Sequence, residues 1–156
     1  MSRRLGEVVP SAATLVLDTS VLVGYLGGRE AISPLATLVL DEWVRSGRNS
    51  AVVSAISAAE LMVWSVRRGR EATAEMTSFL LGFEGMSIRS ADFLVAAEAA
   101  RIRAETNATM PDALIAATAT LAGADRLLTN DGALHDRLRP LKGAPTVLLL
   151  SDFTAA

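Results

Sequence analysis

Cysteine is absent from the 156 residues of this chain, and this absence excludes several kinds of chemistry. Without cysteine there is no disulfide bond, no thiolate ligand for a metal and no cysteine nucleophile. A chain of this kind fits a reducing compartment, so we expect a cytoplasmic protein.

Histidine and lysine are nearly absent as well. The one histidine, His135, lies near the end of a segment that we expect to be a surface helix, and Lys142 is the only lysine. The chain also lacks a phosphate-binding GxxxxGK loop and the GxSxG turn of serine hydrolases. The formal net charge of −2 provides no overall positive field for binding nucleic acid. With these catalytic groups absent or nearly so, the side chains that remain as candidates for catalysis are mainly the carboxylates of aspartate and glutamate.

Long apolar runs are missing too. No stretch of about 18 residues is apolar and free of charge, as a membrane-spanning helix requires. The chain begins with two basic residues, Arg3 and Arg4, as secretory signals do. The apolar stretch that follows is short, because it begins only after Pro10 and Ser11 and ends at Asp18. A secretory signal needs about 7–15 uninterrupted apolar residues, so we expect neither secretion nor a membrane span.

What the chain does contain is 51% hydrophobic residues, with only 4% aromatic ones. Its length suits one domain, which we place at residues 14–152 after a flexible arm at residues 1–13. Short buried strands are predicted at 14–18, 51–54, 86–88, 126–129 and 146–150, and they alternate with helices. This alternation predicts an α/β fold of three layers, with a short, mainly parallel sheet of four to five strands between helices. An all-helical bundle is the alternative, because the helices are rich in alanine.

Capping signals mark where several of these helices begin. Ser33 precedes Pro34, a proline suited to the first turn of a helix. Ser57 with Glu60 three residues later forms a capping-box pattern. Ser90 is expected to open the long alanine-rich helix, and Pro111 the helix after it.

Four acidic residues stand out by their surroundings: Asp18, Glu60, Asp112 and Asp131. Asp18 ends the first strand, and Glu60 interrupts an uncharged run. Asp112 begins an almost entirely apolar helix, and Asp131 follows the strand at 126–129. Each also has a purely structural explanation, as a helix cap, a capping-box partner, a complement to the helix dipole or a turn residue.

Taken together, the four acids indicate a metal site. A parallel sheet brings strand ends and the following helix starts to one edge, where ligands bind. Two carboxylates about 4 Å apart repel each other by about 4 kcal/mol at an effective dielectric constant near 20. The cluster therefore needs either protonation or a divalent cation. Oxygen ligands favour Mg²⁺ or Mn²⁺ over zinc, and such ions support phosphodiester hydrolysis.

The segments around these acids resemble the ordered acidic motifs of PIN-domain ribonucleases, and among them the VapC toxins of toxin–antitoxin pairs. The resemblance covers about residues 14–150. It rests on Asp18-Thr19-Ser20-Val21-Leu22, Ser57-Ala58-Ala59-Glu60-Leu61, Asp112-Ala113-Leu114-Ile115-Ala116-Ala117-Thr118-Ala119 and Thr129-Asn130-Asp131. One departure is that seventeen residues precede Asp18, whereas the first acid of the family usually lies very near the initiating methionine.

The resemblance implies a Mg²⁺- or Mn²⁺-dependent endoribonuclease that hydrolyses RNA by in-line attack of an activated water and inhibits translation. Asp18 and Asp112 would bind the metal directly, and Asp131 would be a further ligand or hold a water. Glu60 would orient a water or act as general base. Ser20 and Thr129 would be hydrogen-bond partners that orient the ligands.

The resemblance also implies partners. The RNA substrate would be a tRNA or an rRNA, and the toxins of the family pair as homodimers. A cognate antitoxin would bind near the 57–88 helices. Most of the apolar residues there should belong to the core, and any excess would form a groove for an amphipathic partner helix.

Two alternatives remain. One is a PIN-like module that binds protein or RNA without catalysis. The other is an aspartate-based phosphotransfer protein, but such a site needs further acids directly after the first strand, where Thr19 and Ser20 stand.

Overall fold

The structure is a computed structural model that describes residues 4–154. Its centre is a parallel sheet of five strands in the order β3-β2-β1-β4-β5. The strands are β1 (Thr14–Leu17), β2 (Ser50–Ser54), β3 (Met86–Arg89), β4 (Arg126–Thr129) and β5 (Thr146–Leu149). The predicted α/β class and the parallel sheet are confirmed.

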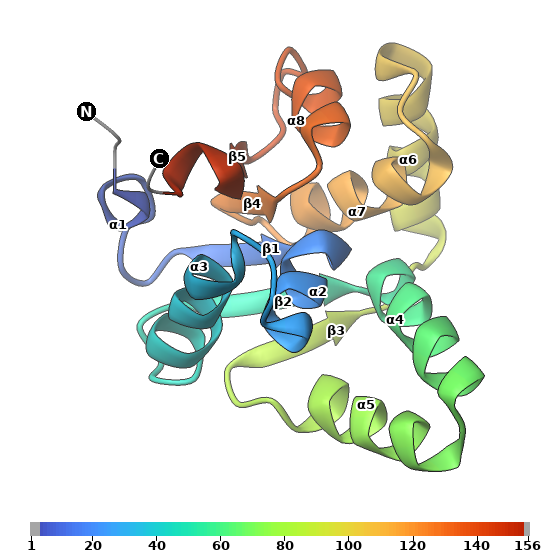
Figure 1. Ribbon diagram of the computed structural model, residues 1–156. Helices are drawn as coiled ribbons and strands as arrows, with labels where there is room; N and C mark the ends of the chain where they lie inside the picture. Colours follow the sequence, from blue (N-terminus) through green and yellow to red (C-terminus); the bar gives the residue numbers. More distant parts are fainter. Residues whose placement is uncertain (1–3, 155–156) are drawn as a thin grey trace.

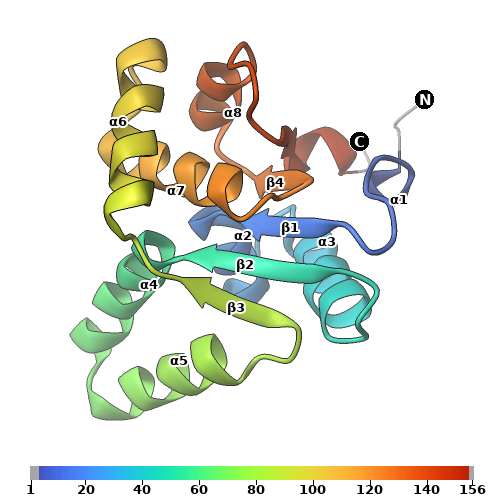
Figure 2. The same ribbon diagram turned by 180° about the vertical axis from the view of Figure 1, so that it is seen from behind.

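Helices connect the strands and cover both faces of the sheet (Figures 1 and 2). The N-terminal ones are α1 (Leu5–Val8), α2 (Thr19–Gly27), α3 (Ser33–Thr37) and the π-helix η1 (Leu38–Val44). They are followed by α4 (Ala55–Arg68), α5 (Arg70–Gly82), α6 (Phe93–Thr106), α7 (Met110–Leu121), α8 (Gly132–Leu138) and the 3₁₀-helix η2 (Leu150–Phe153). None of the helices within residues 4–154 is long and apolar enough to cross a membrane.

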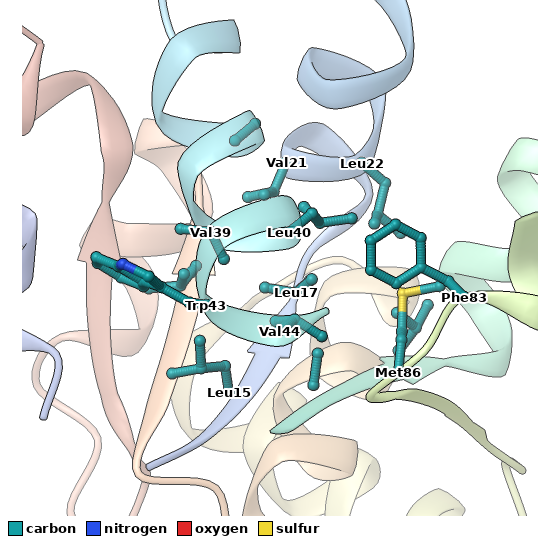
Figure 3. Packing of buried hydrophobic residues seen from close by; sticks show 14 of the residues in the cluster. Leu15, Leu17, Val21, Leu22, Val39, Leu40, Trp43, Val44, Phe83 and Met86 are labelled. Carbon is teal, nitrogen blue, oxygen red and sulfur yellow. The ribbon is translucent and has the colours of Figure 1, made fainter. Parts of the chain in front are cut away.

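The core has two halves because successive side chains of a strand point to opposite faces of the sheet. Leu15 and Leu17 pack with α2, α3, η1 and residues of α5 on one face (Figure 3). Val16, which lies between them, packs with α6, α7 and α8 on the other face. All three side chains are fully buried. Strands buried on both faces read as continuous apolar runs, as observed here.

Residues 5–13 differ from the flexible arm that the sequence predicts for residues 1–13. Leu5, Val9 and Ala13 recur at helical spacing, and all three are buried in the core. Arg48 donates a hydrogen bond to the Val9 carbonyl, and Asn49 donates to the carbonyls of Pro10 and Ala13. Residues 1–3 of the predicted arm lie outside the described residues.

Three helix starts also differ from the sequence prediction. Ser33 is the first residue of α3, and its hydroxyl donates to the Gly24 carbonyl and accepts from the Glu30 amide. Helix α4 begins after Ser54, whose hydroxyl accepts from the Ile56 amide. Ser57 is therefore already inside α4, buried and without a hydrogen-bond partner among the described residues. Helix α6 begins after Asp92, which accepts from the Val95 amide, rather than at Ser90.

Candidate active site

Asp18 lies at the C-terminal edge of the sheet, where β1 passes into α2. Its backbone amide donates to the Leu128 carbonyl of the neighbouring β4 at 3.0 Å, which extends the strand pairing by one residue. The residue is only 5% exposed. Asp18 occupies the capping position of α2, but its side chain makes no capping hydrogen bond. Its carboxylate is therefore not used as a helix cap.

Two hydroxyl groups hold the Asp18 carboxylate instead. Ser20 Oγ donates to Asp18 Oδ2 at 2.7 Å, and Thr129 Oγ1 donates to the same oxygen at 2.8 Å. The backbone amides of Asn130 and Asp131 donate in turn to Ser20 Oγ at 2.8 Å and Thr129 Oγ1 at 2.9 Å. With Oδ2 engaged twice, Oδ1 is the oxygen available to a ligand. The structure thus brings Ser20 and Thr129 to the positions that the sequence prediction requires.

Asp131 follows β4, the strand that pairs with β1, and lies at the start of α8. Its Oδ1 accepts from the amides of Ala133 at 2.9 Å and Leu134 at 3.3 Å, so Asp131 caps this helix. The sequence suggests a turn residue as the structural explanation of Asp131, whereas the structure makes it the cap of α8, a role that does not compete with a second one. The cap fixes the carboxylate and uses Oδ1, which leaves Oδ2 available.

Asp112 and Glu60 come from two helices that begin at the same edge. Asp112 lies in the first turn of α7, after Thr109, whose hydroxyl accepts from the Asp112 amide at 3.3 Å. Glu60 lies in the second turn of α4, following β2. Both positions follow from the parallel topology, because each helix starts where the site lies.

All four acids line one cleft of about 280 Å³. The cleft is completed by Thr19, Ser20, Val23, Glu30 and Ile115. Glu30 is an additional carboxylate that the sequence interpretation missed. It lies in the exposed segment between α2 and α3, where no strand end or helix start marks it.

Two of the acids, Asp112 and Glu60, have raised pKa values, first through burial and then through neighbouring negative charge. Burial raises the pKa of the Asp112 carboxyl, and the nearby charges of Asp131 and Asp18 add to this, while Thr109 and Arg137 oppose it. Partial burial also raises the pKa of Glu60, whose residue as a whole is exposed. Thr19 opposes that shift, and the charges of Asp18 and Asp112 increase it. The cleft therefore carries an excess of negative charge, which Arg137 offsets only in part.

The donor set of the cleft fits a hard divalent cation. Every side chain that could donate an electron pair there does so through oxygen, which is the preference of Mg²⁺ and Mn²⁺. No three acidic or histidine side chains within residues 4–154 converge closely enough to enclose an ion. Mg²⁺ keeps several of its waters and usually takes only one or two carboxylates. The cleft consequently suits a hydrated ion.

Comparisons with known proteins agree with this arrangement. Residues 15–139, which make up most of the chain, match the PIN domain family. No curated protein sequence matches.

Several solved structures share the fold, and one of them is a toxin–antitoxin complex. A toxin–antitoxin complex from Klebsiella pneumoniae has 23% identity and a TM-score of 0.64, covering 87% of this chain and 97% of the other. FitAcB from Neisseria gonorrhoeae has 21% identity and a TM-score of 0.66, covering 88% and 98%. VapC20 of Mycobacterium tuberculosis, described as a toxin that cleaves the sarcin-ricin loop, has 15% identity and a TM-score of 0.62, covering 77% and 92%. At these identities the likeness concerns the fold.

Proposed function

The chain belongs to the PIN domain family, and from that premise we propose that it is a Mg²⁺- or Mn²⁺-dependent endoribonuclease. The observation that carries this proposal is the convergence of Asp18, Glu60, Asp112 and Asp131 on one cleft. Phosphodiester hydrolysis of this kind requires a cation site. Carboxylates that repel one another around an open cleft provide such a site, because a cation relieves their repulsion. A purely structural role would not need four acids in one cleft.

In this proposal Asp18 and Asp112 bind the cation and Asp131 is a further ligand or holds one of its waters. A divalent ion bound there supplies positive charge for the scissile phosphate and lowers the pKa of the attacking water. Ser20 and Thr129 fix the direction of the Asp18 carboxylate, since both donate to its Oδ2. Hydrogen-bond partners of this kind affect metal binding strongly.

Glu60 is proposed as the group that orients the attacking water and accepts its proton. Its raised pKa supports this role, because a base works best when its pKa approaches the operating pH. Glu60 is also more accessible than Asp18, which is nearly buried. It can therefore reach a water on the open side of the cleft.

We further propose that the protein is the toxin of a VapBC-type pair and inhibits translation in the cytoplasm by cutting a tRNA or an rRNA. Structures of the same fold come from toxin–antitoxin complexes, and one of them is described as cleaving the sarcin-ricin loop. The antitoxin would bind near the 57–88 helices, where Val63, Trp64, Val66 and Leu81 are exposed apolar residues. As implied by the family, the toxin would form a homodimer.

The proposal is tested with purified protein, total RNA, and Mg²⁺ or Mn²⁺. We expect the wild type to cut RNA and Asp18→Asn to lose the activity, because the amide cannot replace an anionic ligand. Asp125→Asn is the matched control: Asp125 lies just before β4, at the opposite edge of the sheet, and accepts from the Thr14 amide. This control should remain active.

Two results would contradict the proposed nuclease. One is a wild-type protein that cuts no RNA with either metal. The other is an Asp18→Asn variant that is as toxic in cells as the wild type, which would favour a PIN-like module that binds without catalysis.

A further inference from the structure

A second groove, of about 400 Å³, continues directly from the acidic cleft. The two share Thr19, Val23 and Glu60 in their walls. Beyond Glu60 the groove is lined by Leu26, Leu61, Trp64 and Met76. A chain-like molecule held at the acids can therefore extend into this groove.

Helix α4 carries three different chemical groups on one face, two of which, Glu60 and Trp64, line the groove, while Arg68 lies at the end of the helix. Glu60, Trp64 and Arg68 are spaced four residues apart, so they lie on one face of the helix, each about 6 Å further along it. The helix starts at the acidic edge and leads away from it to the turn before α5 (Figure 1). The order along this face is a carboxylate at the site, then an aromatic ring, then a cation.

Trp64 is exposed in a way that the packing of the core does not explain. It is 49% exposed, whereas Trp43, the other tryptophan, is 7% exposed. The Arg68 guanidinium lies 4.0 Å from the centre of the Trp64 ring, a cation–π contact that orients the indole. The ring is thus held in place at the surface of the groove.

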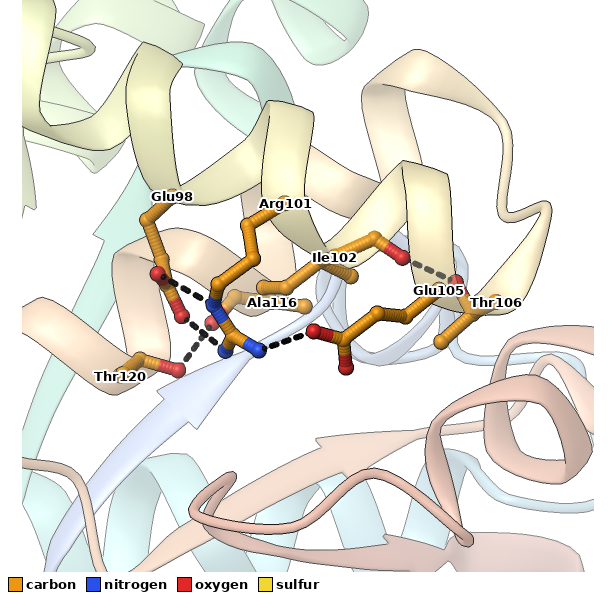
Figure 4. A network of polar contacts seen from close by, with 7 residues as sticks. All are labelled: Glu98, Arg101, Ile102, Glu105, Thr106, Ala116 and Thr120. Carbon is orange, nitrogen blue, oxygen red and sulfur yellow. Dashed lines mark hydrogen bonds and ion pairs between the residues drawn. The ribbon is translucent and has the colours of Figure 1, made fainter.

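The α4–α5 turn, beyond Trp64 along the chain, carries three arginines that do not line the groove itself: Arg67, Arg68 and Arg70. All three are exposed, and none forms an ion pair or a side-chain hydrogen bond within the described residues. Arg101 on α6 is different, because it pairs with Glu98 at 2.6 Å and with Glu105 at 2.8 Å (Figure 4). The positive charge at the α4–α5 turn is therefore left available to an anion.

We propose that this groove binds the nucleotides of single-stranded RNA that flank the scissile phosphate, with one base stacked on Trp64 and the following phosphates at the arginines of the α4–α5 turn. The proposal rests on the proposed nuclease function and names where its substrate lies. An aromatic platform beside a line of cations is how single-stranded nucleic acid is bound without strong sequence preference. The antitoxin, when bound near these helices, would exclude the RNA from this groove.

The test uses the full chain, a 12-nucleotide oligouridylate as the probe, and a metal-free buffer with EDTA so that no cleavage occurs. We expect RNA to quench the fluorescence of Trp64, the exposed tryptophan. Trp64→Ala should bind at least fivefold more weakly, which corresponds to about 1 kcal/mol of base stacking. Trp64→Phe should retain most of the affinity but lose the quenching, because only the buried Trp43 then remains.

Two further sets of variants separate stacking from charge. Phe93→Ala removes an aromatic residue that is 83% exposed on α6, outside the groove, and should bind like the wild type. Arg67→Gln and Arg70→Gln should each flatten the dependence of log Kd on log salt by about 0.7, as expected when one phosphate contact to a single strand is lost.

The outcomes separate this inference from the proposed function. If Trp64→Ala binds the oligonucleotide as tightly as the wild type and cuts RNA with an unchanged KM, the inference is overturned while the nuclease stands. If the wild type binds RNA with quenching of Trp64 but never cuts it, the nuclease fails and the binding groove remains. If Trp64→Ala weakens the binding of an antitoxin peptide but leaves RNA binding unchanged, the groove belongs to the protein partner and the inference is overturned.

Discussion

At the scale of single residues, the Asp18 carboxylate depends on two hydroxyl groups that reach it from different elements. Ser20 belongs to α2 and Thr129 to β4, and each is itself fixed by a backbone amide from residues 130–131. This places one charged oxygen in a defined position at the end of a buried strand. The same two hydroxyls also connect Asp18 to the segment that carries Asp131. The two carboxylates are therefore positioned together.

Thr129→Val tests this coupling, because valine has nearly the same shape but no hydroxyl. The change removes the donor to Asp18 Oδ2 and the acceptor for the Asp131 amide. We expect nuclease activity to fall by about 10- to 100-fold, the range seen for groups that orient metal ligands. Thr118→Val is the control, since Thr118 is equally buried but bonds to Leu114 and Ser54 instead. Equal losses of activity in both variants would argue against a specific role for Thr129.

Asp112 makes the cleft a source of instability when no cation is bound. Its pKa is raised in the folded protein, by burial first and then by the charges of Asp131 and Asp18. A carboxyl with a raised pKa holds its proton more tightly in the folded state, so stability falls as the pH rises through the ordinary and then the raised value. At neutral pH the ionised group carries the full cost.

We therefore expect Asp112→Asn to raise the melting temperature at pH 7 in EDTA. The gain should shrink as the pH is lowered and vanish below the ordinary carboxyl pKa of about 4, where the wild-type residue is protonated in both states. Thermal melts at several pH values measure this difference. Asp92→Asn, at an exposed cap of α6, is the control and should show no gain. A gain for Asp112→Asn that persists unchanged at low pH would rule out the electrostatic explanation.

The sequence predicts the four acids because each stands at a strand end or near a helix start within apolar surroundings, and the structure places all four on one cleft. Glu30 could not be found in this way. It is exposed in a loop, at neither a strand end nor a helix start, and only the tertiary arrangement of α2 and α3 brings it to the cleft. Metal binding by these residues stays a prediction.

At the scale of elements, the start of α4 shows why a local pattern can mislead. Ser57 and Glu60 have the spacing of a capping box, but Ser54, three residues earlier, caps the helix. Both serines suit a cap by residue type. The choice is decided by where β2 ends, and its pairing with β3 runs up to Ser54. A register set by long-range pairing is not visible in a window of four residues.

Helix α1 shows the opposite problem, a short element whose importance only the packing reveals. We expect Leu5→Ala to destabilise the protein by about 2–5 kcal/mol, because Leu5 is 3% exposed in the core and its loss leaves a cavity. At this chain length that corresponds to a drop in melting temperature of roughly 5–15 °C. Leu81→Ala is the matched control, since Leu81 is 74% exposed and should change stability by less than about 0.5 kcal/mol. If both variants melt alike, α1 does not contribute to the core in solution.

At the scale of the whole molecule, the sequence predicts the parallel sheet but not the order of its strands. Alternating buried strands and helices are enough to predict a parallel sheet covered on both faces. The placement of β1 between β2 and β4 depends on the long-range pairing of Leu15 with Ala51 and with Arg126. This order matters for function. The strand order changes direction between β1 and β4, next to Asp18, and ligands bind at such a topological switch point in open α/β sheets.

The molecule as a whole should therefore respond to a divalent cation by becoming more stable. Four carboxylates share one cleft, so an ion that binds only the folded state adds about 2.7 kcal/mol when its concentration is 100 times its Kd. For a chain of this size, we expect millimolar Mn²⁺ to raise the melting temperature by roughly 5–10 °C. NaCl of equal ionic strength controls for screening of the repulsion, and Asp18→Asn should abolish most of the effect while Asp125→Asn retains it. A melting curve that Mn²⁺ leaves unchanged would show that the folded protein holds no preformed cation site, and the proposed catalytic role of the cleft would then have to be abandoned.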